Sequence, residues 1–441
     1  MYKRQLFTLR VARSPAGVRF PLEEKARIAF EGKIVGSLRK NGSHVYVATD
    51  KGKLYCLDGT DQKVVWEYGS EAGLIFSPVT GTESLFILDQ EGRLTRLDKS
   101  GKPVWKSGFK NATPASMSLG PGGLYIGTQE GSLLALDAAS GEILWQFDTG
   151  GAILARTVFW EDRVVCGSLD GEVYVLNRKG HLLGTLSAGS PVQVTPLVDG
   201  DRVYLGTEDC YFHCVDLRRM KRKWKILLGG RILAPPRADE KRVFLSASNS
   251  VLYCLNKKSG EILWWRPLPS RSPYEIEFSD GGLVVSSFSS TLVGWDRKTG
   301  EAIGTYDAGS EVRSNPAWLD SRLLIPLHDP REDMGSLVFL GRMVEVKLSP
   351  SLASPQPAGT EIRFTASAVG FERPKFEFMV HRDGEKIVVQ KASEKNSWVW
   401  FPEKEGDYHV GVKVKDAWQE KEVELAFVIV AGKKQEQDKL K

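Results

Sequence analysis

Long apolar segments are absent from this chain of 441 residues. No run approaches the roughly 18 apolar residues that a membrane-spanning helix needs, and the first twenty residues lack the apolar core of a secretory signal. No window longer than about ten residues repeats its apolar positions with the period of a helix. These absences exclude a membrane-spanning helix and a helical architecture, and they leave strands as the dominant element.

Cysteine and histidine are also scarce. The five cysteines end at Cys254 and no two are adjacent, so the C-terminal part cannot contain a disulfide. The densest group is Cys210, His213 and Cys214, but consecutive residues of a strand point to opposite faces. Buried small side chains explain this group better than a metal site does. No Ser-His-Asp, phosphate-loop or paired-carboxylate pattern occurs, and we expect no catalytic residue, cofactor or metal.

The chain contains instead a pattern that returns every 39 or 40 residues. A fixed spacing of this length is typical of repeat architectures. One column of the repeat holds Asp58, Asp98, Asp137, Asn177, Asp216, Asn256 and Asp296. A second column, shortly after the first, holds Trp66, Trp105, Trp145, Gly184, Trp224, Trp264 and Gly304. We interpret the acidic column as hairpin turns in which the side chain caps backbone amides.

Each repeat predicts four short strands, which is one blade of a β-propeller. Residues 323–325 and 336–340 supply strands of an eighth repeat that has no outer strand of its own, and residues 27–30 can complete it. Such closure removes free sheet edges. The predicted fold class is therefore all-β, with an N-terminal extension at 1–22 and an eight-bladed β-propeller at 23–341.

The segment Ala135-x-Asp137-x-x-Ser140-Gly141-x-x-x-Trp145 resembles the tryptophan-docking repeat of the PQQ-type eight-bladed propellers. The resemblance covers about residues 26–341. This family includes quinoprotein alcohol dehydrogenases and the non-catalytic BamB-like scaffolds of outer-membrane assembly. The dehydrogenases imply a calcium-held PQQ, an Asp base and a vicinal cysteine pair.

This chain has no Cys-Cys sequence, and its inner strands offer Glu275, Glu277 and Glu311 but no Asp. The resemblance therefore favours a non-catalytic scaffold that binds protein partners in the bacterial cell envelope. The lack of a signal sequence leaves a cytoplasmic location open. The alternative function is a quinoprotein dehydrogenase or a small-ligand sensor that uses the central channel.

A second module follows the repeats. About seven alternating strands between residues 343 and 430 predict an immunoglobulin-like β-sandwich, in which Tyr408 resembles a tyrosine corner. The last residues, 431–441, form a polar tail that is typical of disorder.

Three groups of side chains depart from the repeat and are candidate binding residues. Each is either a docking element or an ordinary solvated or internally paired group. A basic turn suits an acidic protein, anionic lipid or a polyanion, although no strong nucleic-acid signal accompanies it. The basic turn contains Arg218, Arg219, Lys221, Arg222 and Lys223, and an acidic insertion contains Asp329, Glu332 and Asp333. A channel mouth that suits a small anion contains Lys33, Arg231 and Glu311, with Arg156 and Arg313 just inside.

Overall fold

The computed structural model describes residues 22–431, apart from 75, 110–111, 113–115, 280, 313, 320–321, 330–332, 372 and 417–419. The chain divides into two compact units, one containing Leu22–Gly341 and the other beginning at Arg342. The regular elements named among the described residues are all β-strands, so the predicted all-β class is confirmed. The described residues contain no helix that is long and apolar enough to cross a membrane.

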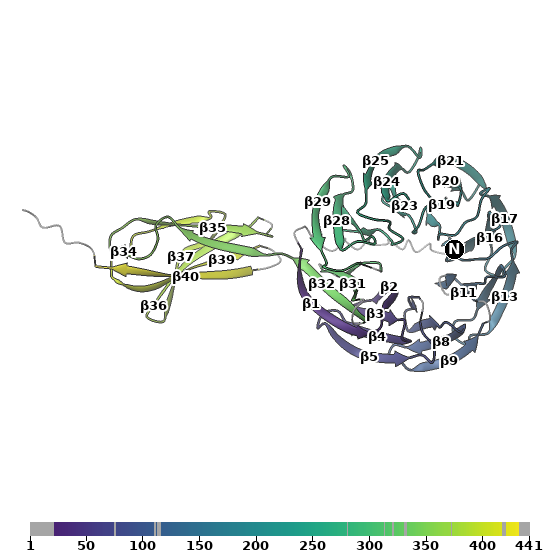
Figure 1. Cartoon of the computed structure of the whole chain (residues 1–441), viewed down its shortest axis with the longest axis horizontal. Coiled ribbons are helices and arrows are strands. Elements are labelled where there is room, and N and C mark those ends of the chain that lie inside the picture. Colours follow the sequence, from purple (N-terminus) through teal and green to yellow (C-terminus); the bar gives the residue numbers. More distant parts are fainter. Residues whose placement is uncertain are drawn as a thin grey trace, which may run out of the picture. The chain divides into compact units, whose positions relative to one another are not determined.

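The first unit is a β-propeller, in which the described residues form eight four-stranded sheets (Figure 1). We number the sheets in chain order. The first four contain β2 (Ile34–Asn41), β3 (His44–Thr49), β4 (Lys53–Asp58) and β5 (Lys63–Gly69); β6 (Val79–Thr80), β7 (Ser84–Leu88), β8 (Arg93–Asp98) and β9 (Pro103–Gly108); β10 (Ser118–Gly120), β11 (Gly123–Gly127), β12 (Ser132–Leu136) and β13 (Ile143–Asp148); and β14 (Val158–Trp160), β15 (Arg163–Gly167), β16 (Glu172–Leu176) and β17 (Leu182–Ser187).

The remaining sheets follow the same order from the centre of the ring to its rim. They contain β18 (Leu197–Asp199), β19 (Arg202–Gly206), β20 (Tyr211–Asp216) and β21 (Lys221–Leu227); β22 (Arg237–Ala238), β23 (Arg242–Ala247), β24 (Val251–Asn256) and β25 (Ile262–Pro267); β26 (Glu277–Phe278), β27 (Gly282–Val285), β28 (Thr291–Asp296) and β29 (Ala302–Asp307); and β30 (Ala317–Leu319), β31 (Arg322–Asp329), β32 (Met334–Arg342) and β1 (Leu22–Glu31).

The first strand of the chain lies in the same sheet as the last three strands of the propeller. β1 is hydrogen-bonded to β32 and forms the outer strand of the eighth sheet (Figure 1). Phe30 of β1 is 2% exposed and packs with Leu324 and Phe339 of its own sheet and with Val45 and Tyr55 of the first sheet. β1 therefore covers an edge that would otherwise be open to pairing with another chain.

Burial along each sheet explains its sequence pattern. The two middle strands are buried on both faces, as in β19 and β20, because each sheet packs between two others. The outer strands alternate exposed and partly buried positions, as in β13. Every Asp or Asn of the acidic column accepts a backbone N–H from two or three residues later, which confirms the interpretation of these residues as turn caps.

Gly184 departs from the tryptophan column, and the structure shows what replaces the missing ring. A Cβ at Gly184 would lie 3.3 Å from Cε of Met220 in the fifth sheet. Met220 occupies the position of the turn glycine in other repeats and has a φ of 49°. Its side chain packs against the apolar cluster that joins the fourth and fifth sheets. In other repeats a tryptophan of one sheet packs against a turn glycine of the next sheet. At this contact the fourth sheet supplies the glycine, Gly184, and the fifth sheet supplies the large side chain, Met220.

The second unit is a sandwich of two sheets around one apolar core. The three-stranded sheet has the order β33-β35-β38, and the five-stranded sheet has the order β34-β40-β39-β36-β37. These strands are β33 (Glu345–Pro350), β34 (Gln356–Pro357), β35 (Ile362–Val369), β36 (Lys375–Arg382), β37 (Glu385–Ser393), β38 (Ser397–Trp400), β39 (Gly406–Lys415) and β40 (Glu420–Val430).

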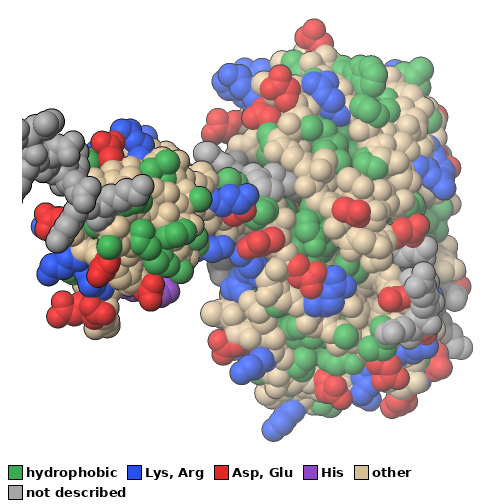
Figure 2. Space-filling model, turned by 60° about the vertical axis from the view of Figure 1, so that its left-hand side comes forward, with side chains coloured by type: hydrophobic (Ala, Val, Ile, Leu, Met, Phe, Trp, Pro, Cys, Tyr) green, Lys and Arg blue, Asp and Glu red, His purple; other side chains and the backbone are tan. Residues whose placement is uncertain are grey.

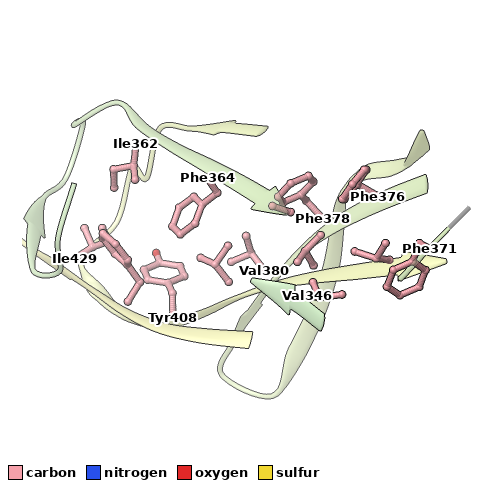
Figure 3. Packing of buried hydrophobic residues seen from close by; sticks show 14 residues of the cluster. Val346, Ile362, Phe364, Phe371, Phe376, Phe378, Val380, Tyr408 and Ile429 are labelled. Carbon is pink, nitrogen blue, oxygen red and sulfur yellow. The ribbon is translucent and has the colours of Figure 1, made fainter. Parts of the chain in front are cut away.

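Aromatic side chains fill the space between these two sheets. Phe364 of β35 faces Phe378 of β36, Tyr408 of β39 and Ile429 of β40 (Figure 3). The hydroxyl of Tyr408 donates a hydrogen bond to the carbonyl oxygen of Lys404 at 2.8 Å. This local bond fits the tyrosine corner that the sequence predicts.

Candidate functional site

Equivalent positions of the repeats form a column at the centre of the propeller, and seven of its eight members line one cavity. Two of the hydrogen bonds between neighbouring positions join the backbone N–H of Arg156 to Oγ1 of Thr195 at 3.1 Å and the backbone N–H of Glu275 to Oδ1 of Asn315 at 2.9 Å. Polar side chains in this column therefore tie some of the inner segments to the next sheet. The eight residues of the column are Ser37, Ser77, Ser116, Arg156, Thr195, Pro235, Glu275 and Asn315.

Two charged members of this column meet in the channel. Arg156 leads into β14 of the fourth sheet and Glu275 leads into β26 of the seventh, and Nη1 of Arg156 lies 3.8 Å from Oε1 of Glu275. Both line a cavity of about 310 Å³. Burial, together with the charge of the nearby Arg39 guanidinium group, lowers the pKa of Arg156 to about 10, and Glu275 opposes the shift. Arg156 therefore stays protonated at neutral pH in an environment that disfavours its charge.

A second charged layer lies two residues further along the inner strands. It contains Arg39 of β2, Arg237 of β22 and Glu277 of β26. Burial raises the pKa of Glu277 to about 7, against the opposing effect of Arg237, and the charge of Glu275 adds to the increase. Burial also lowers the pKa of Arg39, while Glu275 and Glu277 oppose that shift.

The sequence analysis named the two glutamates but missed Arg39 and Arg237. Both arginines stand in the same repeat column as Glu277. Comparing that column across all repeats would have found them.

The structure describes four of the five predicted channel-mouth residues. Arg156 lines the cavity, whereas Lys33, Arg231 and Glu311 are exposed and outside its lining. Nη1 of Arg231 lies 2.9 Å from Oε1 of Glu208, which neutralises that arginine locally. Arg313 lies outside the described residues.

The channel does not fit the calcium and PQQ that the dehydrogenases of this propeller class imply. Calcium prefers several carboxylate and carbonyl oxygens at one centre. Glu275 instead faces Arg156, and Glu277 is surrounded by the charges of Arg39 and Arg237. These guanidinium groups would repel a divalent cation, so we derive no chemistry through that cofactor.

The predicted basic turn spans the connection between β20 and β21 and the first three residues of β21, and three of its five cations have acidic partners. Nε of Arg218 lies 2.7 Å from Oδ2 of Asp201, and its Nη2 lies 3.3 Å from Oε1 of Glu161. Arg219 and Lys223 both approach Oδ2 of Asp216, at 3.5 and 3.2 Å. These pairs hold the turn against its own sheet and the fourth sheet, leaving Lys221 and Arg222 for other contacts.

The turns at the equivalent place in the fourth, sixth and seventh sheets also carry cations. All of these turns join the third and fourth strands of their sheets, so they lie on one face of the propeller. The same turn contains Ala138 and Ala139 in the third sheet. Six of the cations are exposed and have no ion pair within 4 Å to a described carboxylate; we call them the basic arc, and they are Arg178, Lys179, Lys221, Arg222, Lys258 and Lys298.

The sequence analysis singled out one turn of this arc because it compared each turn with the consensus and not with its neighbours. In the view of Figure 2, basic and acidic side chains are intermingled over the visible surface of the propeller. The face of the basic arc also carries acidic residues, such as Glu161, Asp162 and Glu240.

The predicted acidic insertion extends a hairpin and is not a separate loop over its described part. β31 and β32 continue their pairing as far as His328 opposite Gly335 and Asp329 opposite Met334. Oδ2 of Asp333 lies 3.0 Å from Nζ of Lys51 in the first sheet. Glu332 lies outside the described residues. This hairpin end is on the propeller face opposite the basic arc, because it joins the second and third strands.

The metal-ligand candidates in the propeller are not brought together as a site. Nε2 of His213 lies 3.1 Å from Oγ1 of Thr207, and burial lowers the pKa of His213 to about 4. In the second unit, ligand atoms of His381, Glu422 and Glu424 lie within 4.8 Å of one another. Nζ of Lys386 already lies 2.6 Å from Glu422 in that group.

Comparison with known protein families identifies the family of this chain. The family model of outer membrane protein assembly factor BamB matches residues 29–147 and 170–324, more than half of the sequence. The chain belongs to this family. No curated protein matches the sequence.

Solved structures share the propeller fold at low sequence identity. BamB from Moraxella catarrhalis is 16% identical with a TM-score of 0.61, covering 72% of this chain and 100% of its own. The computationally designed Ika8 protein is 14% identical with a TM-score of 0.62, covering 74% and 100%. Quinohemoprotein alcohol dehydrogenase from Comamonas testosteroni is 12% identical with a TM-score of 0.60, covering 73% and 77%. At these identities the likeness concerns the fold alone.

Proposed function

We propose that the chain is a non-catalytic, eight-bladed propeller scaffold of the bacterial cell envelope, extended by an immunoglobulin-like domain, which binds an acidic protein partner through the basic arc. The observation that carries this proposal is the basic arc, whose cations on four consecutive sheets have no ion pair to a described carboxylate. Membership of the BamB family supports the scaffold role. The guanidinium groups beside Glu275 and Glu277 argue against the dehydrogenase alternative.

The chemistry of the arc favours a protein over a uniformly anionic surface. Arg218 is held by Asp201 and Glu161 on the same face, and Glu240 lies among the cations of the sixth sheet. A membrane of anionic lipid or a nucleic-acid backbone would meet these carboxylates with like charge. A protein can place its own acidic side chains opposite the cations and avoid the carboxylates, which gives specificity.

The test is charge reversal in the arc with a matched reversal outside it. Arg222→Glu with Lys258→Glu should abolish recovery of the partner from extracts of the native cells at low salt. The control is Lys63→Glu with Lys102→Glu, since these exposed cations lie in the equivalent turns of the first and second sheets. Exposed charges contribute about 0–1 kcal/mol per pair to folding, so both variants should melt like the wild type.

The recovered partner should also dissociate as salt rises, because screening weakens an interaction between exposed charges. Recovery that survives reversal of the arc, or that is lost equally in the control variant, would contradict the proposal. Saturable PQQ binding with dye-linked oxidation of an alcohol would favour the dehydrogenase alternative.

A further inference from the structure

Among the described residues, the two charged layers of the channel contain more positive than negative groups. The guanidinium groups are those of Arg39, Arg156 and Arg237, and the carboxylates of the two layers are those of Glu275 and Glu277. Buried charges are normally matched by opposite charges, because desolvation makes an unmatched charge costly. Protonation increases the imbalance, since the pKa of Glu277 is about 7 and this carboxyl is only partly ionised at neutral pH.

Arg156 is the cation of this set that faces the cavity. Its Nη1 is 3.8 Å from Glu275, which exceeds the 2.7–3.2 Å of an N–H···O hydrogen bond. None of the described residues accepts a hydrogen bond from its guanidinium group. Its planar set of donors is therefore directed at the cavity without a close acceptor, although its side chain is only 26% exposed.

The rest of the cavity wall combines apolar side chains with polar groups. Its volume of about 310 Å³ is at the lower end of the range of small-molecule pockets. Gln193, Thr195 and Asn315 add hydrogen-bonding groups. The apolar part of the wall includes Phe76, Leu154, Val194, Leu233, Pro235 and Pro273.

We propose that this cavity binds a small organic carboxylate with an apolar body, whose carboxylate pairs with Arg156. A guanidinium group matches a carboxylate with two parallel hydrogen bonds. The apolar body then contacts Phe76, Leu154 and Leu233. Inorganic anions have no apolar body and cannot make these contacts. This site is independent of the basic arc and of the proposed scaffold function.

The test titrates the full chain with sodium benzoate by isothermal titration calorimetry at pH 7 and low salt. Benzoate should saturate a single site, while the uncharged benzamide and inorganic phosphate should bind at least tenfold more weakly. No binding of benzoate at millimolar concentration would overturn the proposal. Benzamide binding as tightly as benzoate would show that the guanidinium group does not contribute to recognition. Phosphate binding as tightly as benzoate would show that the apolar side chains do not contribute.

Variants locate the site. Arg156→Gln should weaken benzoate binding at least tenfold, whereas Arg231→Gln should change it less than twofold, because Arg231 lies outside the lining. Glu275→Gln removes the carboxylate that competes for Arg156 and should bind benzoate more tightly than the wild type. Unchanged affinity in Arg156→Gln, or weaker binding in Glu275→Gln, would overturn the assignment.

Melting curves accompany each variant. If Arg156→Gln does not fold, Arg156→Lys keeps the positive charge but loses the two parallel donors, and it should bind benzoate several-fold more weakly. Wild-type affinity in Arg156→Lys would then overturn the proposed pairing. The Glu275→Gln titration also tests whether the carboxylate of benzoate pairs with Arg156, and it does so without altering the arginine.

Discussion

Trp145 donates its indole N–H to the carbonyl oxygen of Arg178 at 2.7 Å, across the boundary between the third and fourth sheets. Its ring also lies against Gly180, where a Cβ would be 2.6 Å from Cδ2 of the indole. Similar approaches of a ring to a glycine link other neighbouring sheets, in the pairs Trp66 with Gly101, Trp105 with Gly141, Trp224 with Gly260, and Trp264 with Gly300. Absence of a side chain at the glycine is what permits the contact.

Gly180→Ala should destabilise the propeller by about 2 kcal/mol or more, because the new methyl group meets the ring and the backbone has a φ of 80°. The matched control is Gly200→Ala. Gly200 has a φ of 58° but nothing lies within 4 Å of its Cβ position, so this variant reports backbone strain alone, about 1 kcal/mol. Thermal melting of both variants measures the difference. Equal melting temperatures would mean that the ring contact contributes nothing.

Gly184 and Met220 should show strong coupling in a double-mutant cycle. Gly184→Trp alone should destabilise the fold, because Cε of Met220 lies 3.3 Å from the new Cβ. Met220→Gly alone leaves the space over Gly184 empty. The double variant restores the arrangement of the other repeats and should recover about 1–3 kcal/mol relative to the sum of the single effects. Additive changes in the free energy of unfolding would refute this exchange of large and small residues.

The pKa of Glu277 predicts a pH-dependent stability. Burial raises this pKa to about 7 from 4.5, and the charged groups around it are Arg39 and Lys40 on β2, Arg237 on β22, and Glu275 before β26. The folded state therefore holds a proton that the unfolded state loses between pH 4.5 and 7, so this carboxyl costs stability as pH rises through that window.

Glu277→Gln removes that cost. Its melting temperature should rise relative to the wild type between pH 5 and pH 8, by the equivalent of about 2 kcal/mol. Glu311→Gln is the control, since Glu311 is exposed and outside the cavity lining. A difference between Glu277→Gln and the wild type that is constant over this pH range would show that Glu277 has an ordinary pKa.

Removal of β1 should open the eighth sheet. Without Leu22–Glu31, the edge of β32 loses its hydrogen-bonded neighbour and the cluster around Phe339 loses Phe30. Exposed edges pair with other chains, so the truncated protein should aggregate or melt at a much lower temperature. Light scattering and thermal melting check this, and removal of residues 432–441 is the matched control. Unchanged melting after removal of β1 would contradict the closure.

Local sequence determined the strands and turns of this protein. The acidic column predicted the hairpin caps because each cap involves residues only two or three positions apart. The apolar runs predicted the buried middle strands, since burial on both faces requires apolar residues throughout. The short strand at Gln356–Pro357 was missed, because two residues carry too little pattern.

The tertiary structure decided which charges meet. Arg156 and Glu275 come from sheets that are not neighbours, and only the ring brings them to one cavity. Likewise, Arg218 is paired with Asp201 and Glu161 because turns of adjacent sheets converge on one face. A repeat pattern gives each residue its position within a sheet. The residue that each side chain contacts in another sheet depends on the closed arrangement of all the sheets. No single repeat contains that information.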